Sequence, residues 1–104
     1  MAYLLQVDFP FEGPFSEKMS TTFLEIAESI NKEKGFQWKI WTESKETKET
    51  KEAGGIYVFE EKKDAENYAE MHEKRLKSFG VKDIRVKIFD INEKLTKLNH
   101  GMIK

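Results

Sequence analysis

Hydrophobic residues recur with two different periods along this chain, and the order of those periods limits the folds that the chain can adopt. Four segments alternate with period two, as half-buried strands do: 3–9, 36–43, 56–60 and 81–91. Two segments, 16–30 and 62–79, repeat apolar residues every three or four positions, which is typical of helices that bury one face. The predicted order is strand, helix, strand, strand, helix, strand.

Two helices inserted between antiparallel strands in this order form the split βαβ pattern. We therefore predict an α+β fold of the ferredoxin-like βαββαβ type, in which both helices cover one face of a four-stranded antiparallel sheet. Ser16 is the predicted N-cap of the first helix, and Gly35 and Gly80 mark the predicted ends of the two helices. The length of 104 residues predicts a single domain, 1–104, with a polar C-terminal tail at 92–104.

The second face of the predicted sheet needs a partner. Its expected members are Leu4, Trp41, Tyr57 and Phe59 or their alternates, together with Phe89, and this is too much aromatic surface to leave in water. Face-to-face pairing of two sheets in a homodimer, a dimeric α+β barrel, would cover it. The tail is expected either to swap onto the partner or to fray.

Charge narrows the classes of partner. Basic and acidic residues nearly balance at a formal net charge of -1, which does not favour binding to a polyanion. The run from Gly55 to Phe59 looks faintly like the aromatic third strand of the RNA-recognition domain, but no basic stripe accompanies it, so we expect no nucleic-acid partner. The segment 45–52, KETKETKE, has no apolar residue and is expected to be a solvated hairpin tip.

Residue types exclude several kinds of chemistry. The chain has no cysteine, which excludes disulfides, thiolate catalysis and cysteine zinc sites. The two histidines, His72 and His100, lack metal-ligand spacing, and no glycine-rich phosphate loop is present, so no metal and no bound cofactor are predicted. Because no long apolar stretch follows the start, we expect neither a signal peptide nor a membrane span, and a cytoplasmic setting fits.

His72 is the one ionisable residue that the periodicity places on the apolar face of the second helix. A neutral imidazole there would serve as a general base or a hydrogen-bond donor near pH 7. The alternative is a core histidine that is bonded to a backbone carbonyl. Tyr57, Glu43, Gln6 and Arg75 are polar groups, at strand ends or on a helix flank, that either point into a cavity or lie in water.

Trp38 and Trp41 are three positions apart on one predicted strand and therefore face opposite sides of the sheet. We expect Trp38 on the helix side, where its indole N–H would orient a phenolic or quinoid oxygen and its ring would stack on an aromatic ligand. Trp41 is then expected on the dimer face. Core packing is the competing interpretation for either ring.

Several runs of the chain resemble one known family. They are Leu4-Leu5-Gln6, Phe9-x-Phe11-x-Gly13-Pro14-Phe15, Ala27-Glu28-Ser29-Ile30-Asn31, Gly35-Phe36-x-Trp38-Lys39-x-Trp41-Thr42-Glu43-Ser44, Glu52-Ala53-Gly54-Gly55-Ile56-Tyr57 and Phe89-Asp90-Ile91-Asn92-Glu93. The run from Trp38 to Ser44 is the most specific, and His72 and Arg75-Leu76-Lys77 also fall where the family carries them. Over nearly its whole length the chain resembles the YdhR-like mono-oxygenases of the dimeric α+β barrel superfamily.

This resemblance implies a homodimer with a pocket between sheet and helices in each subunit, similar to that of cofactor-free quinone-forming mono-oxygenases. In that chemistry an electron-rich phenol or anthrone is deprotonated and itself reduces O₂, so neither metal nor flavin is needed. The resemblance implies His72 as base or oxyanion partner, Trp38 and Tyr57 as orienting or stacking groups, and Arg75 as a charge stabiliser. The charged hairpin tip is longer than the family pattern, which affects the rim near Glu43 and not the core.

The predicted function is therefore a cofactor-independent mono-oxygenase that acts on a small aromatic, phenol-like or anthrone-like molecule with O₂. Trp41, Glu43 and Gln6 complete the candidate substrate-binding residues. Two alternatives stay open. One is a non-catalytic dimeric barrel that binds a small apolar ligand, and the other is a haem-binding or haem-degrading barrel in which His72 ligates iron.

Overall fold

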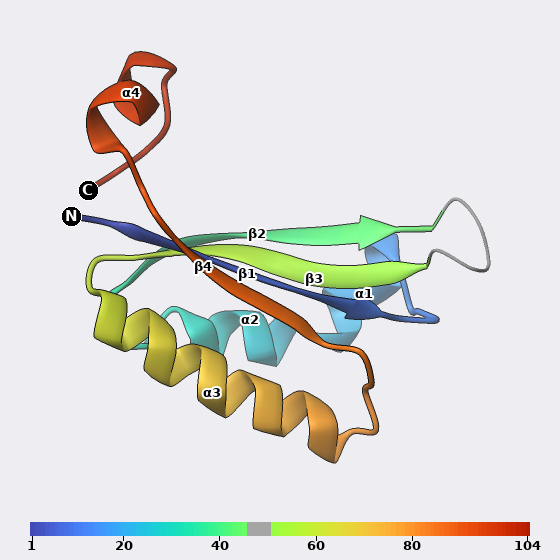
Figure 1. Cartoon of the computed structure of the whole chain (residues 1–104). Helices are drawn as coiled ribbons and strands as arrows, with labels where there is room; N and C mark the ends of the chain where they lie inside the picture. The colour runs from blue at the N-terminus through green and yellow to red at the C-terminus, as the bar shows by residue number, and fades with distance from the viewer. Residues whose placement is uncertain (46–50) are drawn as a thin grey trace.

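The computed structural model describes residues 1–45 and 51–104, and within them it confirms the predicted α+β class (Figure 1). The elements, in chain order, are β1 (Tyr3–Pro10), α1 (Ser16–Thr22), α2 (Leu24–Ile30), β2 (Phe36–Ser44), β3 (Glu52–Phe59), α3 (Lys62–Ser78), β4 (Arg85–Asp90) and α4 (Glu93–Leu98). In the described part of the chain the strands form one four-stranded sheet in the order β2-β3-β1-β4. Every neighbouring pair is antiparallel.

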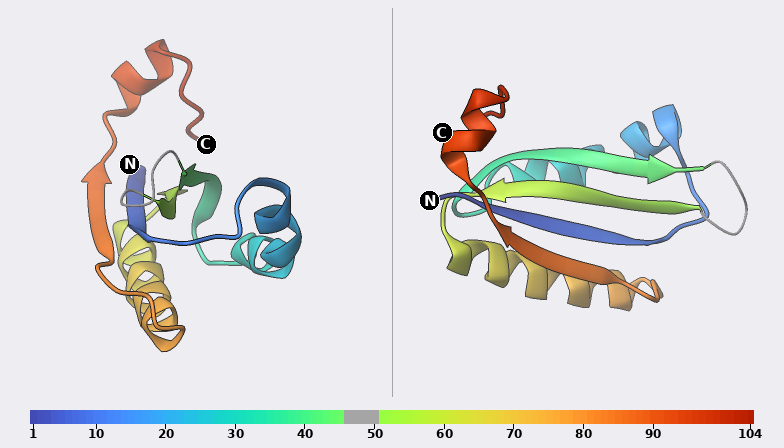
Figure 2. Two further views of the ribbon diagram at one scale, coloured as in Figure 1. Left: turned by 90° about the vertical axis from the view of Figure 1, so that its right-hand side faces the viewer. Right: turned by 45° about the horizontal axis from the view of Figure 1, so that its top comes forward.

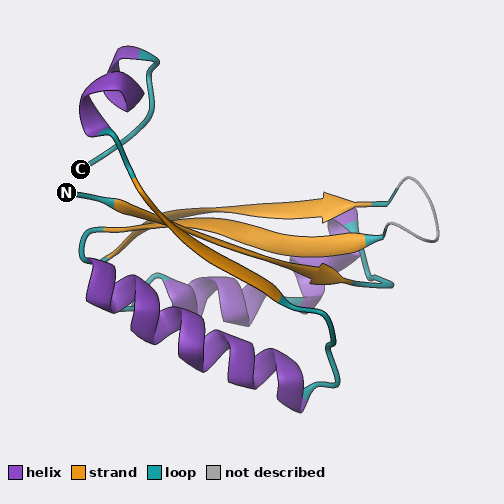
Figure 3. Ribbon diagram, viewed as in Figure 1, coloured by secondary structure: helices purple, strands orange, loops and turns teal. Residues whose placement is uncertain are grey.

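The sheet has one covered face and one open face. Helices α1, α2 and α3 pack on the same side, whereas α4 lies on the other side near the end of the sheet where the chain begins (Figures 1 and 2). Colouring by secondary structure makes the two layers plain, with α1, α2 and α3 beneath the strands and α4 above them (Figure 3). This arrangement is consistent with a ferredoxin-like fold and with the predicted placement of both helical segments on one face.

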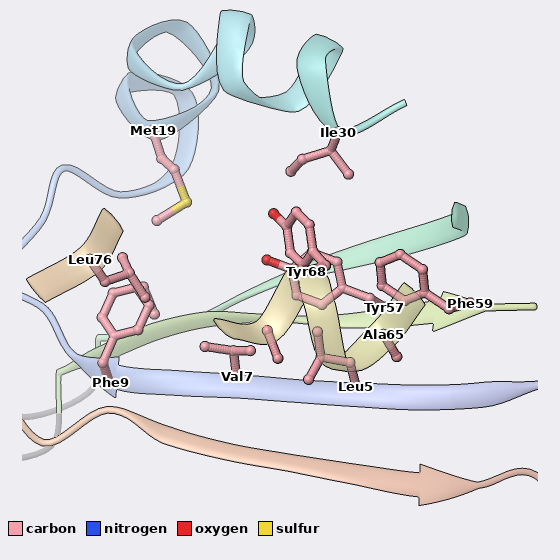
Figure 4. Close-up of a cluster of buried hydrophobic side chains, with 12 residues drawn as sticks. Leu5, Val7, Phe9, Met19, Ile30, Tyr57, Phe59, Ala65, Tyr68 and Leu76 are labelled. Atoms are coloured by element: carbon pink, nitrogen blue, oxygen red, sulfur yellow. The ribbon is translucent and has the colours of Figure 1, made fainter. Parts of the chain in front are cut away.

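The core lies between the covered face and the helices (Figure 4). Alternation places Leu5 and Val7 of β1 beside Tyr57 and Phe59 of β3 on that face, and all four are almost completely buried. From the helices, the core receives Met19, Ile30, Ala65, Tyr68, Ala69 and Leu76. The predicted periodicities of the first strand and of the second helical segment are thus confirmed.

The first helical segment differs from the prediction of one helix with Ser16 as its N-cap. The chain forms two short helices that meet at Phe23, whose φ of -106° and ψ of 16° leave the helical region. The residue before α1 is Phe15, which makes no side-chain capping bond. Instead the carboxylate of Glu43 accepts the backbone N–H of Ser16, with both oxygens at 3.1 Å. A residue from a distant strand therefore takes over the capping that Ser16 was predicted to supply.

Strand β2 contains an irregularity that reverses the predicted orientation of its two tryptophans. The pairing with β3 shifts between Phe36 and Trp38, so that Phe36 lies opposite Phe59 but Trp38 lies opposite Val58. Beyond the shift, Trp41 faces the helices and Trp38 faces the open side. The expectation that Trp38 lies on the helix side was wrong, because the extra residue in β2 moves every later side chain to the other face.

The same register corrects the predicted composition of the open face. Leu4 and Phe89 pair with each other across β1 and β4 on that face, as predicted. Trp41, Tyr57 and Phe59 instead point toward the helices. The prediction had also allowed their alternates on this face, and the apolar residues on the open side of β2 and β3 are indeed such neighbours: Trp38, Ile40, Ile56 and Val58.

Two boundaries and the C-terminal tail also differ. Strand β3 begins at Glu52, earlier than the predicted residue 56, and β4 begins at Arg85, later than the predicted residue 81. The tail forms α4 and then returns to β2, where the indole N–H of Trp38 donates to the carbonyl of Met102 at 2.7 Å. Of the predicted hairpin tip, residues 46–50 lie outside the described residues. No helix of the described chain has the length and apolar character needed to cross a membrane.

Candidate functional site

A cavity of about 410 Å³ lies between the covered face of the sheet and the helices. Most of its wall is aromatic or aliphatic, contributed by Phe9, Phe11, Met19, Phe23, Ile26, Trp41, Ala53, Leu76, Phe79 and Val81. Lys39, His72 and Arg75 contribute the ionisable groups, and Thr22 adds a hydroxyl. An apolar cavity of this size with a few convergent polar groups is typical of a site for a small organic molecule.

Lys39 enters the cavity from β2 because it lies on the same side of the strand as Trp41, two residues further on. Its Nζ lies 3.4 Å from the centroid of the Trp41 ring and 4.4 Å from that of Tyr57. The space is provided by Gly55, since a Cβ at that position would overlap Cε of Lys39. The glycine thus allows a long basic side chain to lie flat across two aromatic faces, which attract its cationic form.

Burial and a neighbouring charge both act on the Lys39 amine. Removal from water, the larger effect, and the Arg75 guanidinium together lower the pKa of Lys39 to about 7. At neutral pH a substantial fraction of the side chain is therefore the free amine, which has a lone pair that accepts a proton or attacks a carbon.

His72 and Arg75 lie one helical turn apart on α3 and contact each other. Arg75 Nη2 lies 2.9 Å from Nδ1 of His72, and because a guanidinium only donates, Nδ1 is the acceptor and the proton of the neutral ring is on Nε2. Burial, followed by the charges of Arg75 and Lys39, lowers the pKa of His72 to about 3. His72 is therefore neutral at physiological pH and presents an N–H donor.

Two tyrosines, Tyr57 and Tyr68, pack against Lys39 and His72. The rings of Tyr57 and Tyr68 are in contact at a tilt of 51°, with centroids 5.1 Å apart (Figure 4). The His72 ring stacks on Tyr68 with a centroid distance of 5.4 Å. Burial raises the pKa of both phenols, so both stay protonated. Tyr68 also lies within 3.4 Å of Arg75 Nη2 through its hydroxyl. The rings fix the positions of Lys39 and His72.

The cavity carries an unbalanced positive charge. Within residues 1–45 and 51–104, no carboxylate forms an ion pair with Lys39 or Arg75, whereas the ion pairs that do form lie elsewhere. The same residues contain no cluster of histidine and carboxylate groups that would hold a metal ion. A site with two basic groups and an apolar wall favours a ligand that is aromatic and that carries or develops negative charge.

The structure brings together four of the seven predicted site residues and separates the other three. His72, Arg75 and Trp41 line the cavity, and Tyr57 lies beneath Lys39. Trp38 is on the open side, where it bonds to Met102. Gln6 is exposed on the open side and its side chain donates to Asp8, while Glu43 is exposed and holds the start of α1.

Lys39 is the residue that sequence reasoning missed. A lysine in a strand is usually on the solvent side, and the prediction assigned a role to Trp38 and to Trp41 but none to Lys39 between them. One signal was present: Lys39 and Trp41 are two apart and therefore share a face, so the ring and the amine had to be buried or exposed together. The sequence did not show whether that shared face was the one toward the helices or the open one.

Fold and cavity together define the class as an α+β ferredoxin-like domain with a ligand-sized apolar cavity beneath its sheet. The family model described as "Putative mono-oxygenase ydhR" matches residues 4–102, and the chain belongs to this family. In a comparison with individual curated proteins, none matches the chain.

Proposed function

We propose that the protein is a mono-oxygenase that oxidises a small phenol-like or anthrone-like molecule in the cavity beneath the sheet, without a metal or an organic cofactor. The observation that carries this proposal is the position of Lys39, whose pKa burial and Arg75 lower to about 7, in an apolar cavity that also contains an N–H donor and a guanidinium. These are the groups required to remove a proton from an aromatic substrate and to hold the resulting anion. Membership of a mono-oxygenase family supports the reaction type.

The overall reaction converts a ring methylene and O₂ into a ring ketone and water. The Lys39 amine takes a proton from the substrate, and the resulting anion transfers one electron to O₂, which gives a substrate radical and superoxide. The two combine through a new C–O bond, and the peroxide takes back the proton from the Lys39 ammonium. Loss of water across the C–O–O–H group then breaks the O–O bond and leaves the ketone. The substrate supplies all the electrons, so no external reductant is needed.

In this proposal His72 and Arg75 stabilise the substrate anion. Because Nδ1 of His72 accepts from Arg75, its Nε2–H is the group that donates to the substrate oxygen, which favours the oxyanion-partner role over the general-base role. A pKa near 3 also makes His72 a weak base beside Lys39. The rings of Trp41 and Phe23 are nearly parallel, with centroids 6.2 Å apart and an interplanar angle of 18°, and both residues line the cavity that would receive an aromatic substrate.

The test is oxygen consumption by metal-stripped protein with a panel of anthrones, hydroquinones and flavonols. We expect O₂ uptake with formation of the carbonyl product, and its loss in Lys39→Met and reduction in His72→Ala. Ligand binding by thermal shift without O₂ uptake across the panel would contradict the proposal and indicate a binding protein. Titration with haemin tests ligation by His72 separately, because a Soret shift would indicate a haem protein.

We further propose that two copies pair through their open sheet faces, as in a dimeric α+β barrel. Ile40 and Phe89 on that face keep 50% and 38% of their surface exposed, although they are large and apolar. Leu4 and Ile56 lie beside them on the same face. A molar mass from light scattering that corresponds to two chains, reduced to one by Ile40→Asp, is the expected result, and a monomer at micromolar concentration would contradict the pairing.

A further inference from the structure

We propose that Lys39 is also a carbonyl-capturing amine, which condenses reversibly with a small aromatic aldehyde or ketone that enters the cavity. The inference goes beyond oxygenation, because it assigns the pocket a second kind of ligand and a covalent bond to the protein. It rests on where the amine lies, on what surrounds it and on the room beside it.

The surroundings of Nζ are those that make a lysine nucleophilic. A lysine amine is activated when it is desolvated in an apolar pocket or lies near another cation. Lys39 meets both conditions, since it lies against the rings of Trp41 and Tyr57 and within the field of Arg75. No ion pair with a carboxylate holds it as ammonium within the described residues, and its lowered pKa agrees with this geometry.

The cavity also has the shape of an aromatic carbonyl site. Its volume of about 410 Å³ adjoins the amine and is walled by Phe9, Phe11, Phe23 and Trp41. An aliphatic carbonyl compound would leave these ring faces without a stacking partner, so an aromatic aldehyde or ketone is the favoured class.

The bond change is simple. The Nζ lone pair attacks the carbonyl carbon to give a carbinolamine, which loses the carbonyl oxygen as water and leaves a C=N bond between Lys39 and the ligand. The two hydrogens of the water come from the amine group, so no oxidant or reductant takes part. Hydrolysis reverses the step and restores the free lysine.

The pH dependence follows from the groups that face Nζ. From α3 these are Arg75 and His72, and from β3 the phenol of Tyr57, which stays protonated. Only the free amine condenses, so capture increases as pH rises through about 7, the pKa that burial and Arg75 give to Lys39. Arg75→Gln removes one of the two causes and is expected to move the midpoint of capture to higher pH.

Lys87 provides a matched control within the same chain. Its Nζ lies 4.8 Å from the centroid of the Phe89 ring, so it also lies over an aromatic face. Lys87 is exposed in the single chain, however, on the edge strand β4 of the open side, and borders no cavity that Lys39 borders. A difference between the two lysines therefore measures the effect of burial and of Arg75, and not of the aromatic contact.

The experiment treats the whole wild-type protein with 2-naphthaldehyde and sodium cyanoborohydride at pH 7.5 without O₂, followed by peptide mass mapping. Borohydride hydride reduces the C=N bond and makes the adduct permanent. We expect at least about tenfold more adduct at Lys39 than at Lys87, or than at Lys74, which is exposed on α3 away from the open face, because burial and Arg75 lower the pKa of Lys39 to about 7 and the cavity lies beside its side chain. The label should diminish when 2-naphthol, which has the same ring system but no carbonyl group, is added in excess as a competitor.

Adduct distributed over the lysines according to their exposure, or absence of adduct at Lys39, would overturn the proposal. The result does not depend on a variant that fails to fold, since the wild type is mapped directly. It also does not depend on oxygenation, because O₂ is absent. Protein that labels at Lys39 but consumes no O₂ with any phenol would preserve this inference while contradicting the proposed mono-oxygenase.

Discussion

Basic side chains on the two faces of the sheet differ in whether they form ion pairs. On the open face, Arg85 is exposed and lies between two carboxylates, with an ion pair to Asp8 and another to Glu52 at 2.8 Å. On the covered face, Lys39 and Arg75 lie in an apolar cavity, and the described residues offer neither of them an ion pair. Both faces belong to one four-stranded sheet, so the difference is a property of side-chain placement and not of the fold.

This difference shows where the chain tolerates an unfavourable arrangement. A buried cation without a counter-ion is destabilising, and such groups are concentrated at functional sites. An exposed ion pair contributes little either way. The basic residues of the cavity are therefore expected to affect activity more than stability. Substitutions of the exposed charges on the open face are expected to leave activity unchanged.

Replacing Lys39 by methionine should produce the largest effect on activity. Methionine keeps the length and apolar stem of lysine but has no base, so we expect O₂ uptake with the best substrate to decrease about 100-fold or more, in the range of lost general-base catalysis. The stability of the folded chain should not decrease, because a desolvated charge is removed. Oxygen uptake and urea denaturation measure the two quantities.

The control for that variant is Lys87→Met on the open face, which removes a lysine that also lies over a ring. Its O₂ uptake should equal that of the wild type. Equal loss of activity in both variants would mean that general charge, and not the cavity amine, matters.

The fold was predictable to a much greater extent than the site. Alternation in 3–9 and helical periodicity in 62–79 are strong local signals, and both elements formed as predicted. The site depends on one extra residue between Phe36 and Trp38, which exchanges the faces of Trp38, Lys39 and Trp41. A bulge is decided by the pairing of two strands, and no feature of the single strand marks it.

Contacts between residues that are distant in the sequence could not be predicted from periodicity either. Glu43 was predicted near the pocket from its place in the strand, yet it holds the start of α1, 27 positions earlier. His72 was predicted correctly on the inner side of the helix, but its tautomer follows from Arg75, and its pKa follows from Arg75 and Lys39 together with burial. Sequence periodicity gives the face of a residue, whereas these properties require the neighbours on other elements.

The adjacent glycines of β3 test the two faces by stability. A Cβ at Gly54 would meet the backbone of β1 at Val7 and Asp8, which cannot easily move, so Gly54→Ala should destabilise the protein by roughly 1–3 kcal/mol. A Cβ at Gly55 would meet the end of the Lys39 side chain, which can rotate away, and would lie 3.1 Å from Cε1 of Tyr57, which requires a shift of a few tenths of an ångström. Gly55→Ala should therefore destabilise the protein less than Gly54→Ala while it displaces the amine and lowers O₂ uptake. A reversed order of the two unfolding midpoints would contradict this assignment.

Low pH should destabilise the folded chain because His72, on the covered side, resists protonation. Its pKa is about 3 when folded and about 6.5 in an unfolded chain, so between these values the unfolded state binds the extra proton. Stability should thus decrease as pH falls from about 6.5 toward 3, with a contribution from this group of at most about 1.4 kcal/mol per pH unit. Urea midpoints across this range should depend less steeply on pH in His72→Gln. The matched variant His100→Gln, in the exposed tail, should retain the wild-type dependence, and an equal change in both variants would refute the role of burial.

The smallest effect is expected from the exposed ion pairs of the open face. Arg85→Gln removes both contacts, to Asp8 and to Glu52, but solvent and salt already screen these charges. The urea midpoint should shift by less than in Gly54→Ala, and the remaining difference from the wild type should diminish in 0.5 M salt. Oxygen uptake should be unchanged, because Arg85 lies on the face opposite the cavity. Arg85 is on β4, an edge strand of the sheet, so a large loss of stability that salt does not reduce would mean that the proposed pairing of two copies buries this edge as well as the apolar centre of the open face.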